Sequence, residues 1–147
     1  MRLTTFSDYT LRVLIYLGLR DEQLCTINQI AEDYNISRNH LMKVVHHLGQ
    51  QGYIETVRGK GGGIRLAQTP GAVNVGTVIR ETEQETSLVE CFESATSCCR
   101  IESACLLKGV FSKALQAFYS VLDDYTLADL LATEAQLRQI FPVAAPT

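Results

Sequence analysis

Three cysteines in the stretch CFESATSCCRIESAC, namely Cys91, Cys99 and Cys105, are the residues of this sequence best suited to chemistry. Thiolates gathered in one irregular segment can hold a soft metal centre, and three of them leave one coordination position for another ligand. Cys98 directly precedes Cys99 and is not counted among the three. Cys25 is better explained as a small buried hydrophobic residue than as a ligand. The segment is therefore a candidate metal site of a sensor.

Three kinds of site remain open from these residues alone. A structural zinc site prefers four tight nitrogen or sulfur ligands, often as paired C-x-x-C, and the adjacent Cys98 and Cys99 are poorly placed to chelate together. A thiol redox switch needs only two cysteines, which would make the third redundant. An iron–sulfur cluster tolerates the wide spacing of Cys91, Cys99 and Cys105, and an incomplete thiolate set makes it labile, which suits a sensor.

The composition is that of a globular protein, since 46% of the 147 residues are hydrophobic and 20% are charged. No apolar run reaches the roughly 18 residues that cross a bilayer, and the N-terminus has no apolar signal core. We therefore expect a cytoplasmic protein with no membrane partner, where clustered thiols favour metal binding or redox activity over disulfides. No nucleophile–base set is present, so we do not expect an enzyme.

The net charge of −3 hides a polarised distribution along the chain. Residues 1–66 carry eight Lys or Arg against six Asp or Glu, whereas residues 67–147 carry five against ten. Within residues 35–65 the balance is five against one, and all three histidines lie there. The middle of the chain is therefore the basic face, where a nucleic acid would bind.

Helical periodicity predicts three helices before residue 52. The first begins at Ser7-Asp8 and carries apolar residues at i, i+3, i+4 and i+7 from residue 11. Thr26 caps a second, short helix, Tyr34-Asn35 forms a turn, and Ser37 caps a third that ends at Gly49 and Gly52. Two short helices joined by so few residues indicate a helix-turn-helix.

The segment GYIETVRGKGGGIRLA predicts a hairpin of two strands, with glycines at its tip. A helix-turn-helix followed by a basic hairpin is a winged helix, which predicts a mainly α fold with a small β-wing. We expect the third helix to meet base edges of double-stranded operator DNA and the wing to meet phosphates. The predicted DNA-binding residues are Ser37, Arg38, Asn39, His40, Lys43, Arg58, Lys60, Gly61 and Arg65.

The C-terminal half combines the cysteine segment with a long helix over residues 104–122. Its apolar residues step by four, three, four and three, and a second apolar stripe runs beside them. A helix that is apolar on two sides needs two partners, so we expect it to pack against its own domain and against a second subunit of a homodimer. The seam is Leu107, Phe111, Ala114, Phe118 and Val121, and the second stripe is Leu106, Val110 and Ala117.

The chain is thereby divided into four parts. They are a winged helix-turn-helix domain (1–80), a cluster-binding loop (81–104), a dimerisation helix with a short closing helix at 126–131 (105–131), and a tail (132–147).

Several motifs together resemble the family of iron–sulfur winged-helix transcriptional regulators, which contains nitric-oxide-sensing repressors, the cluster-assembly regulator IscR and the iron regulator RirA. They are MRLTTFSDYTLRVLIYL, ISRNHLMKVVHHLGQQGYIETVRGKGGGIRL, the three-cysteine segment and DDYTLADLL. The resemblance runs from Met1 to about Leu131. VRGKGGGIRL is shared broadly by the family, whereas SDYTLR, SRNHLMKVV and YTLADL are typical of its nitric-oxide-sensing members.

The resemblance implies a cluster in each subunit, 4Fe–4S or alternatively 2Fe–2S. It selects Cys91, Cys99 and Cys105 as ligands over Cys98, and it disfavours the IscR-type histidine, because that position is Lys108 here. Asp8, which by itself is best explained as a helix cap, matches the aspartate that the partner subunit supplies in nitric-oxide-sensing members.

The implied function is repression that is relieved when nitric oxide nitrosylates the cluster and the dimer leaves its operator. The alternative is a regulator that senses iron or cluster status.

Overall fold

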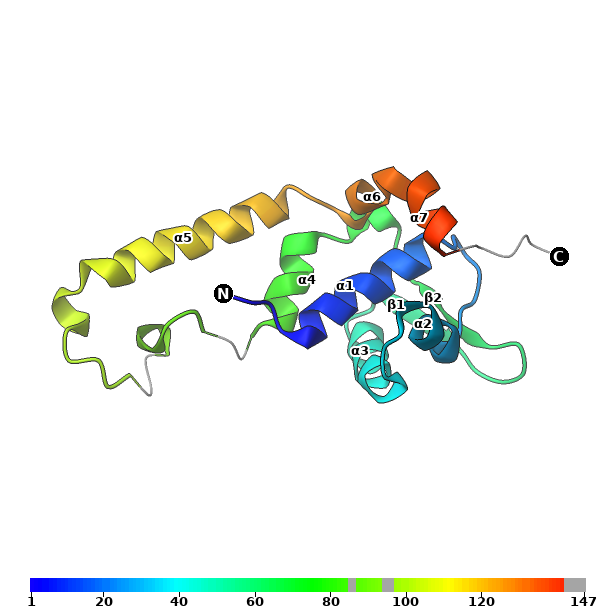
Figure 1. Ribbon diagram of the computed structural model, residues 1–147, viewed down its shortest axis with the longest axis horizontal. Helices are drawn as coiled ribbons and strands as arrows, with labels where there is room; N and C mark the ends of the chain where they lie inside the picture. The colour runs from blue at the N-terminus through cyan, green and yellow to red at the C-terminus, as the bar shows by residue number, and fades with distance from the viewer. Residues whose placement is uncertain (85–86, 94–96, 142–147) are drawn as a thin grey trace.

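The computed structural model describes residues 1–84, 87–93 and 97–141 and is mainly helical, with one two-stranded antiparallel sheet (Figure 1). The predicted fold class is thus confirmed. No helix within these ranges is both long and apolar enough to span a membrane. The elements are α1 (Thr5–Gly18), α2 (Ile27–Tyr34), α3 (Arg38–Gln50), β1 (Ile54–Val57), β2 (Gly63–Leu66), α4 (Val75–Thr82), α5 (Leu106–Asp123), α6 (Leu127–Leu130) and α7 (Glu134–Ile140).

Helices α2 and α3 form the predicted helix-turn-helix. Thr26 and Gln29 make a reciprocal capping box at the start of α2, which satisfies two backbone N–H groups that the helix itself leaves open. Asn35 then takes the left-handed conformation, with φ 53°, and ends the helix. Ser37 occupies the N-cap position of α3, although its side chain makes no capping hydrogen bond.

Helix α1 begins one turn earlier than the sequence predicted. Thr4, not Ser7 or Asp8, is the N-cap residue, and its hydroxyl accepts a hydrogen bond from the Ser7 backbone N–H at 3.1 Å. The Ser7 side chain is fully buried and turns toward the end of α4. A hydroxyl that looked like a cap is therefore used in a tertiary contact.

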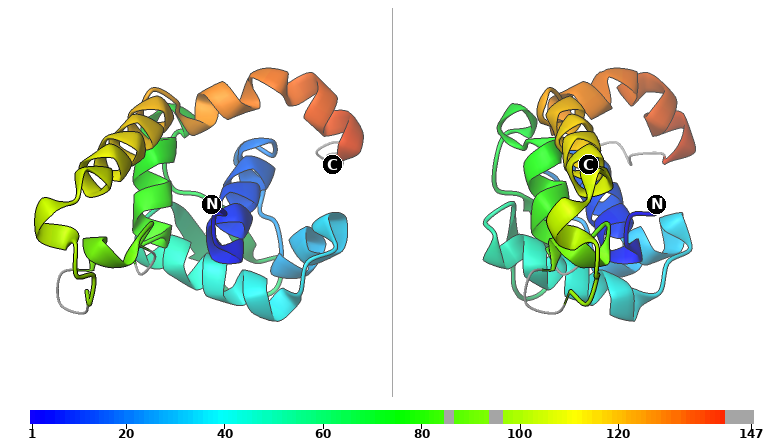
Figure 2. Two further views of the ribbon diagram at one scale, coloured as in Figure 1. Left: turned by 60° about the vertical axis from the view of Figure 1, so that its left-hand side comes forward. Right: turned by 90° about the vertical axis from the view of Figure 1, so that its left-hand side faces the viewer.

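Helix α1 runs through the middle of the fold, where it packs against α3, α4, β2 and α6 (Figure 2). Its apolar face supplies Val13, Leu14 and Leu17 to a core that α3 completes with Leu41, Val44 and Leu48. All six side chains are buried. Full burial of one such apolar side chain stabilises a fold by about 1.5–3 kcal/mol. Helix α3 is therefore held in place by its packing against α1.

The wing is a hairpin whose register pairs Ile54 with Leu66 and Val57 with Gly63. Gly59 and Gly61 at its tip have φ values of 99° and 76°, a backbone conformation that residues other than glycine rarely adopt. The glycine-rich tip predicted from the sequence is thus required by the turn.

Helix α5 extends away from the winged helix and carries the cysteine segment at its far end (Figure 1). Its C-terminal end is fixed to α4, because Arg80 binds both carboxylate oxygens of Asp123 at 2.6 and 2.7 Å. The Asn74 amide also donates to the Asp123 backbone carbonyl at 2.7 Å. The cysteine segment is therefore connected to the winged helix through α5, whose C-terminal end is held by hydrogen bonds to Arg80 and Asn74.

The exposed apolar stripe of α5 combines residues of the two stripes that the sequence predicted. It is made by Leu107, Val110, Ala114, Ala117 and Val121, with Leu106 beside it. Phe111 and Phe118, which belong to the predicted seam, are half-buried. Phe118, for example, lies beside Met1 in a hollow between α5 and the N-terminal segment.

Part of the expected tail is a helix. Residues Glu134–Ile140 form α7, and the Phe141 ring that follows lies 4.7 Å from the ring of Tyr34 and 5.8 Å from that of Tyr16. Arg138 approaches Asp21 at 3.6 Å. This helix was not predicted because it depends on aromatic partners far away in the sequence. Residues 142–147 lie outside the described residues.

Gly76 offers a test of the α4–α5 junction. A Cβ built there would lie 2.0 Å from Asp123 Oδ1 and 3.0 Å from the Asp123 backbone nitrogen. Gly76→Ala should therefore lower the free energy of unfolding by about 1–2 kcal/mol, since overpacking of ~1–3 kcal/mol outweighs the better helix propensity of alanine. Urea unfolding measures the change. Gly71→Ala is the matched control, because nothing lies within 4 Å of its Cβ; equal effects of the two changes would contradict the close approach.

Candidate functional site

Two of the three predicted ligands, Cys91 and Cys105, line one hollow of about 510 Å³ at the far end of α5. Cys91 lies in a short 3-10 turn (Glu90–Phe92), and Cys105 is the N-cap residue of α5. The helix dipole favours negative charge at such a position. All five cysteines of the chain are free thiols. The hollow is lined by Cys91, Phe92, Cys105, Lys108, Gly109 and Ser112.

Cys99, the third predicted ligand, is exposed and does not line this hollow. The backbone before it is held at two points. The Ser97 hydroxyl donates to Glu102 Oε2 at 2.6 Å, and the Cys98 N–H donates to Glu90 Oε1 at 2.7 Å. Within the described ranges, no three His, Cys, Asp or Glu side chains are close enough to hold a metal ion. One chain in this conformation thus brings together two thiols of the three.

Lys108 stands beside the two thiols as a cation. Its ammonium donates to Glu102 Oε1 at 2.5 Å, and this hydrogen bond, helped by Cys91 and Cys105, raises the pKa of the lysine. The same contact, with the Ser97 hydroxyl, holds the pKa of the Glu102 carboxyl below its usual range. Lys108 therefore stays protonated and has no lone pair for a metal, whereas its charge favours an anionic occupant of the hollow.

Asp8 lies in the first turn of α1 and lines a different hollow, together with Tyr9, Arg12 and Tyr34. Arg12 Nη2 is 2.9 Å from Asp8 Oδ2, in a pair one helical turn apart. The Asp8 side chain is 47% exposed. Its carboxylate is therefore accessible from outside the chain, but it does not meet the cysteines of its own chain.

The predicted DNA-binding residues of α3 and of the wing tip are exposed, with one exception. Arg65 is the exception, because it is half-buried and forms an ion pair with Glu55, its direct partner across the two strands. The exposed members are Ser37, Arg38, Asn39, His40 and Lys43 on α3, and Arg58, Lys60 and Gly61 on the wing. These residues have the cations, amide and imidazole that suit base edges and phosphates.

Two aromatic contacts between α1 and α3 were missed in the sequence. The Phe6 ring meets His47 edge-on, with centroids 5.3 Å apart, and the Tyr9 ring lies 6.1 Å from His40. The signal that could have found them is the pair of aromatic residues three apart on α1 and the pair of histidines seven apart on α3. Asp8 therefore lies between two residues that contact the recognition helix.

Comparisons with known proteins agree with this arrangement. A sequence model of the Rrf2 family, described as "Iron-dependent Transcriptional regulator", matches residues 3–133. The HTH-type transcriptional regulator NsrR of Bacillus subtilis (strain 168) is 50% identical over 141 residues, which cover 95% of this chain and 97% of that protein. NsrR of Geobacillus kaustophilus is also 50% identical and is covered to 96%.

Among solved structures, the oxidized form of CymR from Staphylococcus aureus superposes with a TM-score of 0.72 at 28% identity. The superposition covers 90% of this chain and 97% of that one. The fold and the family resemblance expected from the sequence are thus both confirmed. The chain is a transcriptional regulator and belongs to the Rrf2 family.

Proposed function

We propose that this chain is a homodimeric repressor that binds operator DNA while an iron–sulfur cluster is intact, and that nitric oxide is its signal. The observation that carries the proposal is a single rod, α5, with a thiol-lined hollow at one end and the winged helix at the other. The relatives named NsrR at about half identity over nearly the whole chain support the same function.

The donor set fits an iron–sulfur cluster in kind. Cys91, Cys99 and Cys105 are free thiols, and thiolate is the donor that such clusters prefer. Lys108 places a positive charge next to two of them, which suits an anionic group. Asp8 of the partner subunit would be the fourth ligand, since the carboxylate is accessible and does not line the thiol hollow of its own chain. We propose a 4Fe–4S cluster in each subunit.

When bound, the cluster supplies irons that nitric oxide can attack. Asp8 of the partner subunit would offer oxygen, a harder donor than sulfur and a weaker match for such iron, so it would be the ligand that is lost most easily. Arg12 lies one turn away and pairs with the Asp8 carboxylate whenever that carboxylate is not ligating. The link between the two subunits through Asp8 could therefore break without leaving the Asp8 carboxylate unpaired, because Arg12 would pair with it.

The second subunit is proposed to cover the exposed stripe of α5. Leu107, Val110 and Val121 are 55–59% exposed, and they follow one another on a single helical face. An exposed apolar stripe with this spacing is typical of helix pairing between subunits. Dimerisation would also present two copies of α3, as binding to two half-sites requires.

The operator is proposed to contact α3 and the wing. Arg38 and Asn39, at the N-terminus of α3, would reach base edges, where arginine favours guanine and asparagine favours adenine. Arg58 and Lys60 would neutralise phosphates. Arg65 pairs with Glu55 through Nε, and its remaining guanidinium nitrogens would reach a phosphate beside the wing.

Nitric oxide is the direct test of the signal. Anaerobically purified protein should be brown, and nitric oxide should lower its operator affinity at least about a hundredfold, toward non-specific binding. Affinity is measured by fluorescence anisotropy at fixed salt, since salt alone changes it. Affinity that survives nitric oxide in the iron-loaded protein would refute this signal.

An iron-responsive regulator is the second candidate, because the matching family is described as iron-dependent. If the chain is an iron-responsive regulator, removal of iron by a chelator should release the DNA in the absence of nitric oxide. Chelator and nitric oxide titrations of the same sample distinguish the two candidates by which of them acts at the lower dose.

The ligand set can be read by cysteine alkylation. In the cluster-free protein, Cys98 and Cys99 should react quickly because they are exposed. Cys25 should react slowly, because burial raises the pKa of its thiol and shields it. Cluster assembly should protect Cys91, Cys99 and Cys105 and leave Cys98 reactive, as measured by mass spectrometry of the peptides. Protection of Cys98 in place of Cys99 would exchange these two residues in the ligand set.

A further inference from the structure

We propose that Glu83 is the positioning residue that couples the cysteine segment to the recognition helix, acting through the first turn of α1. The inference rests on the proposed function and deepens it, because it names the path by which the state of the cysteine segment reaches α3. The path has three parts: a hollow next to the cysteines, a hydrogen-bonded junction at Thr4 and Ser7, and two aromatic contacts with α3.

Glu83 follows the last residue of α4 and binds the start of α1. Its Oε1 accepts from the Thr4 backbone N–H at 2.7 Å and from the Thr4 hydroxyl at 2.9 Å. The Ser7 hydroxyl also lies within hydrogen-bond distance of Oε1 and is 2.7 Å from the Thr82 hydroxyl. One carboxylate oxygen thus gathers donors of the N-cap residue and of the first turn, and the negative charge suits the helix N-terminus.

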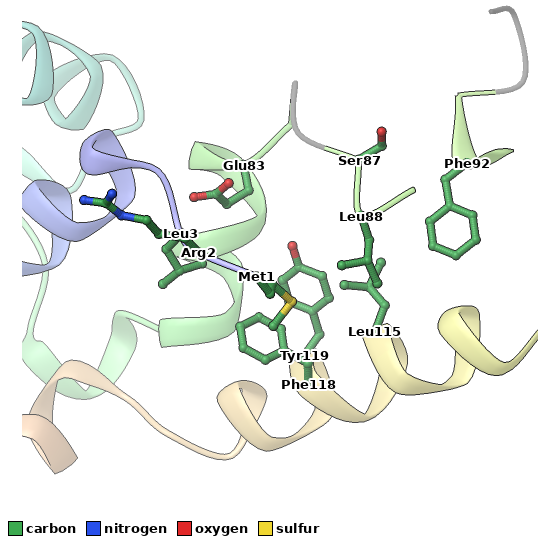
Figure 3. A pocket seen from close by; sticks show the side chains of 10 residues that line it. All are labelled: Met1, Arg2, Leu3, Glu83, Ser87, Leu88, Phe92, Leu115, Phe118 and Tyr119. Atoms are coloured by element: carbon green, nitrogen blue, oxygen red, sulfur yellow. The ribbon is translucent and has the colours of Figure 1, made fainter. Parts of the chain in front are cut away.

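The junction borders the cysteine segment. Glu83 lines a hollow of about 510 Å³ with Met1, Leu3, Leu88 and Phe92, over Leu115, Phe118 and Tyr119 of α5 (Figure 3). Phe92 also lines the hollow of Cys91 and Cys105, and it is the next residue after Cys91. A displacement of Cys91 would therefore move Phe92, which lines the same hollow as Glu83 and the N-terminal residues before Thr4.

The output side of the path is the contact of α1 with α3. Phe6 and Tyr9 flank the same turn and meet His47 and His40, whose ring centroids are 5.3 and 6.1 Å away. His40 is itself exposed on the proposed DNA-binding surface. Because Ser7 is fully buried, this turn cannot shift without exchanging its hydrogen-bond partners, which favours two discrete positions over a gradual drift.

The test compares operator affinity with and without the cluster. Glu83→Ala should keep the iron content per chain but reduce the ratio of cluster-loaded to cluster-free affinity about tenfold or more. Glu83→Gln should restore most of this ratio, because an amide oxygen accepts the same hydrogen bonds. Glu134→Ala removes a carboxylate on α7, away from this junction, and should leave the ratio unchanged. Equal loss of affinity in both forms of Glu83→Ala would show a purely structural role and overturn the proposal.

A second readout needs no cluster. In the full-length apo-protein, Glu83→Ala should shift the ring resonances of His40 and His47, while His46, which has no such contact with α1, stays in place. Unchanged His40 and His47 resonances would overturn the coupling. If the wild-type protein bound its operator equally well with and without the cluster, the proposed function would fail, and the histidine spectra would still decide whether Glu83 controls α3.

Discussion

Cys105→Ala should give a colourless protein that binds its operator no more tightly than unrelated DNA. Cys105 lies beside Cys91 and forms the N-cap of α5, so its loss removes one of the two thiols that the chain already holds in one hollow. Two thiols and a carboxylate are too few to retain a cluster. The expected loss of operator affinity is about a thousandfold or more, the usual gap between specific and non-specific binding.

Cys98→Ala is the matched control for Cys105→Ala. It removes a thiol from the same segment, but Cys98 is exposed, and its backbone N–H donates to Glu90. Iron content, visible absorbance and operator affinity should therefore equal those of the wild type. A brown Cys105→Ala protein with normal iron content would remove Cys105 from the ligand set.

Val110→Glu should convert the dimer into a monomer and abolish operator binding with it. Val110 is 58% exposed in the middle of the apolar stripe of α5. A second subunit would bury it there, and a carboxylate buried without a partner costs several kcal/mol. A monomer would present one α3 in place of two and would lack the partner's Asp8, so both operator affinity and cluster retention should fall.

Sedimentation velocity measures the oligomeric state, and an operator titration of the same sample measures the function. Gln116→Glu is the matched control, since Gln116 is exposed on α5 but lies on the side of Arg80 and Asp123, away from the stripe. It should stay dimeric. A dimeric Val110→Glu protein would place the subunit interface on another surface.

Both predictions depend on α5 as a rigid connection. The C-terminal end of α5 is fixed to α4 by Arg80 and Asp123, and Glu83, which follows α4, binds the start of α1. The Arg80 guanidinium also lies 4.5 Å from the centre of the Tyr119 ring. A structural change in the cysteine segment could therefore reach the winged helix in two ways, through α5 itself or through the hydrogen bonds of Glu83.

Local signals were sufficient for the DNA-binding half of the fold. The cap at Thr26, the left-handed Asn35 and the glycines of the wing each act within a few residues, so the sequence predicted the helix-turn-helix and hairpin with nearly correct bounds. The cations of residues 35–65 are exposed, except for the half-buried Arg65. Its pairing with Glu55 depends on strand register, which no local pattern of single residues reveals.

The sequence predicted two apolar stripes on α5 but did not tell which of their residues face outward. Leu107, Ala114 and Val121 do belong to the exposed stripe, but a heptad pattern cannot tell which neighbouring apolar residues turn toward the chain's own hollows. Phe118 turns inward beside Met1, a residue 117 positions away. The same reason explains α7, whose aromatic partners at Tyr16 and Tyr34 come from the other end of the chain.

The sequence by itself determined the fold class, the basic stretch at residues 35–65 and the set of thiols, because each depends on residue type and short-range spacing. Only the tertiary structure decided that Cys91 and Cys105 share a hollow with the cation of Lys108 while Cys99 lies outside it. It also decided that Thr4 rather than Ser7 begins α1, because the Ser7 hydroxyl meets Glu83 and Thr82 from α4. Contacts between residues more than 70 positions apart have no signature in local periodicity, and it is such contacts that join the cysteine segment to the recognition helix.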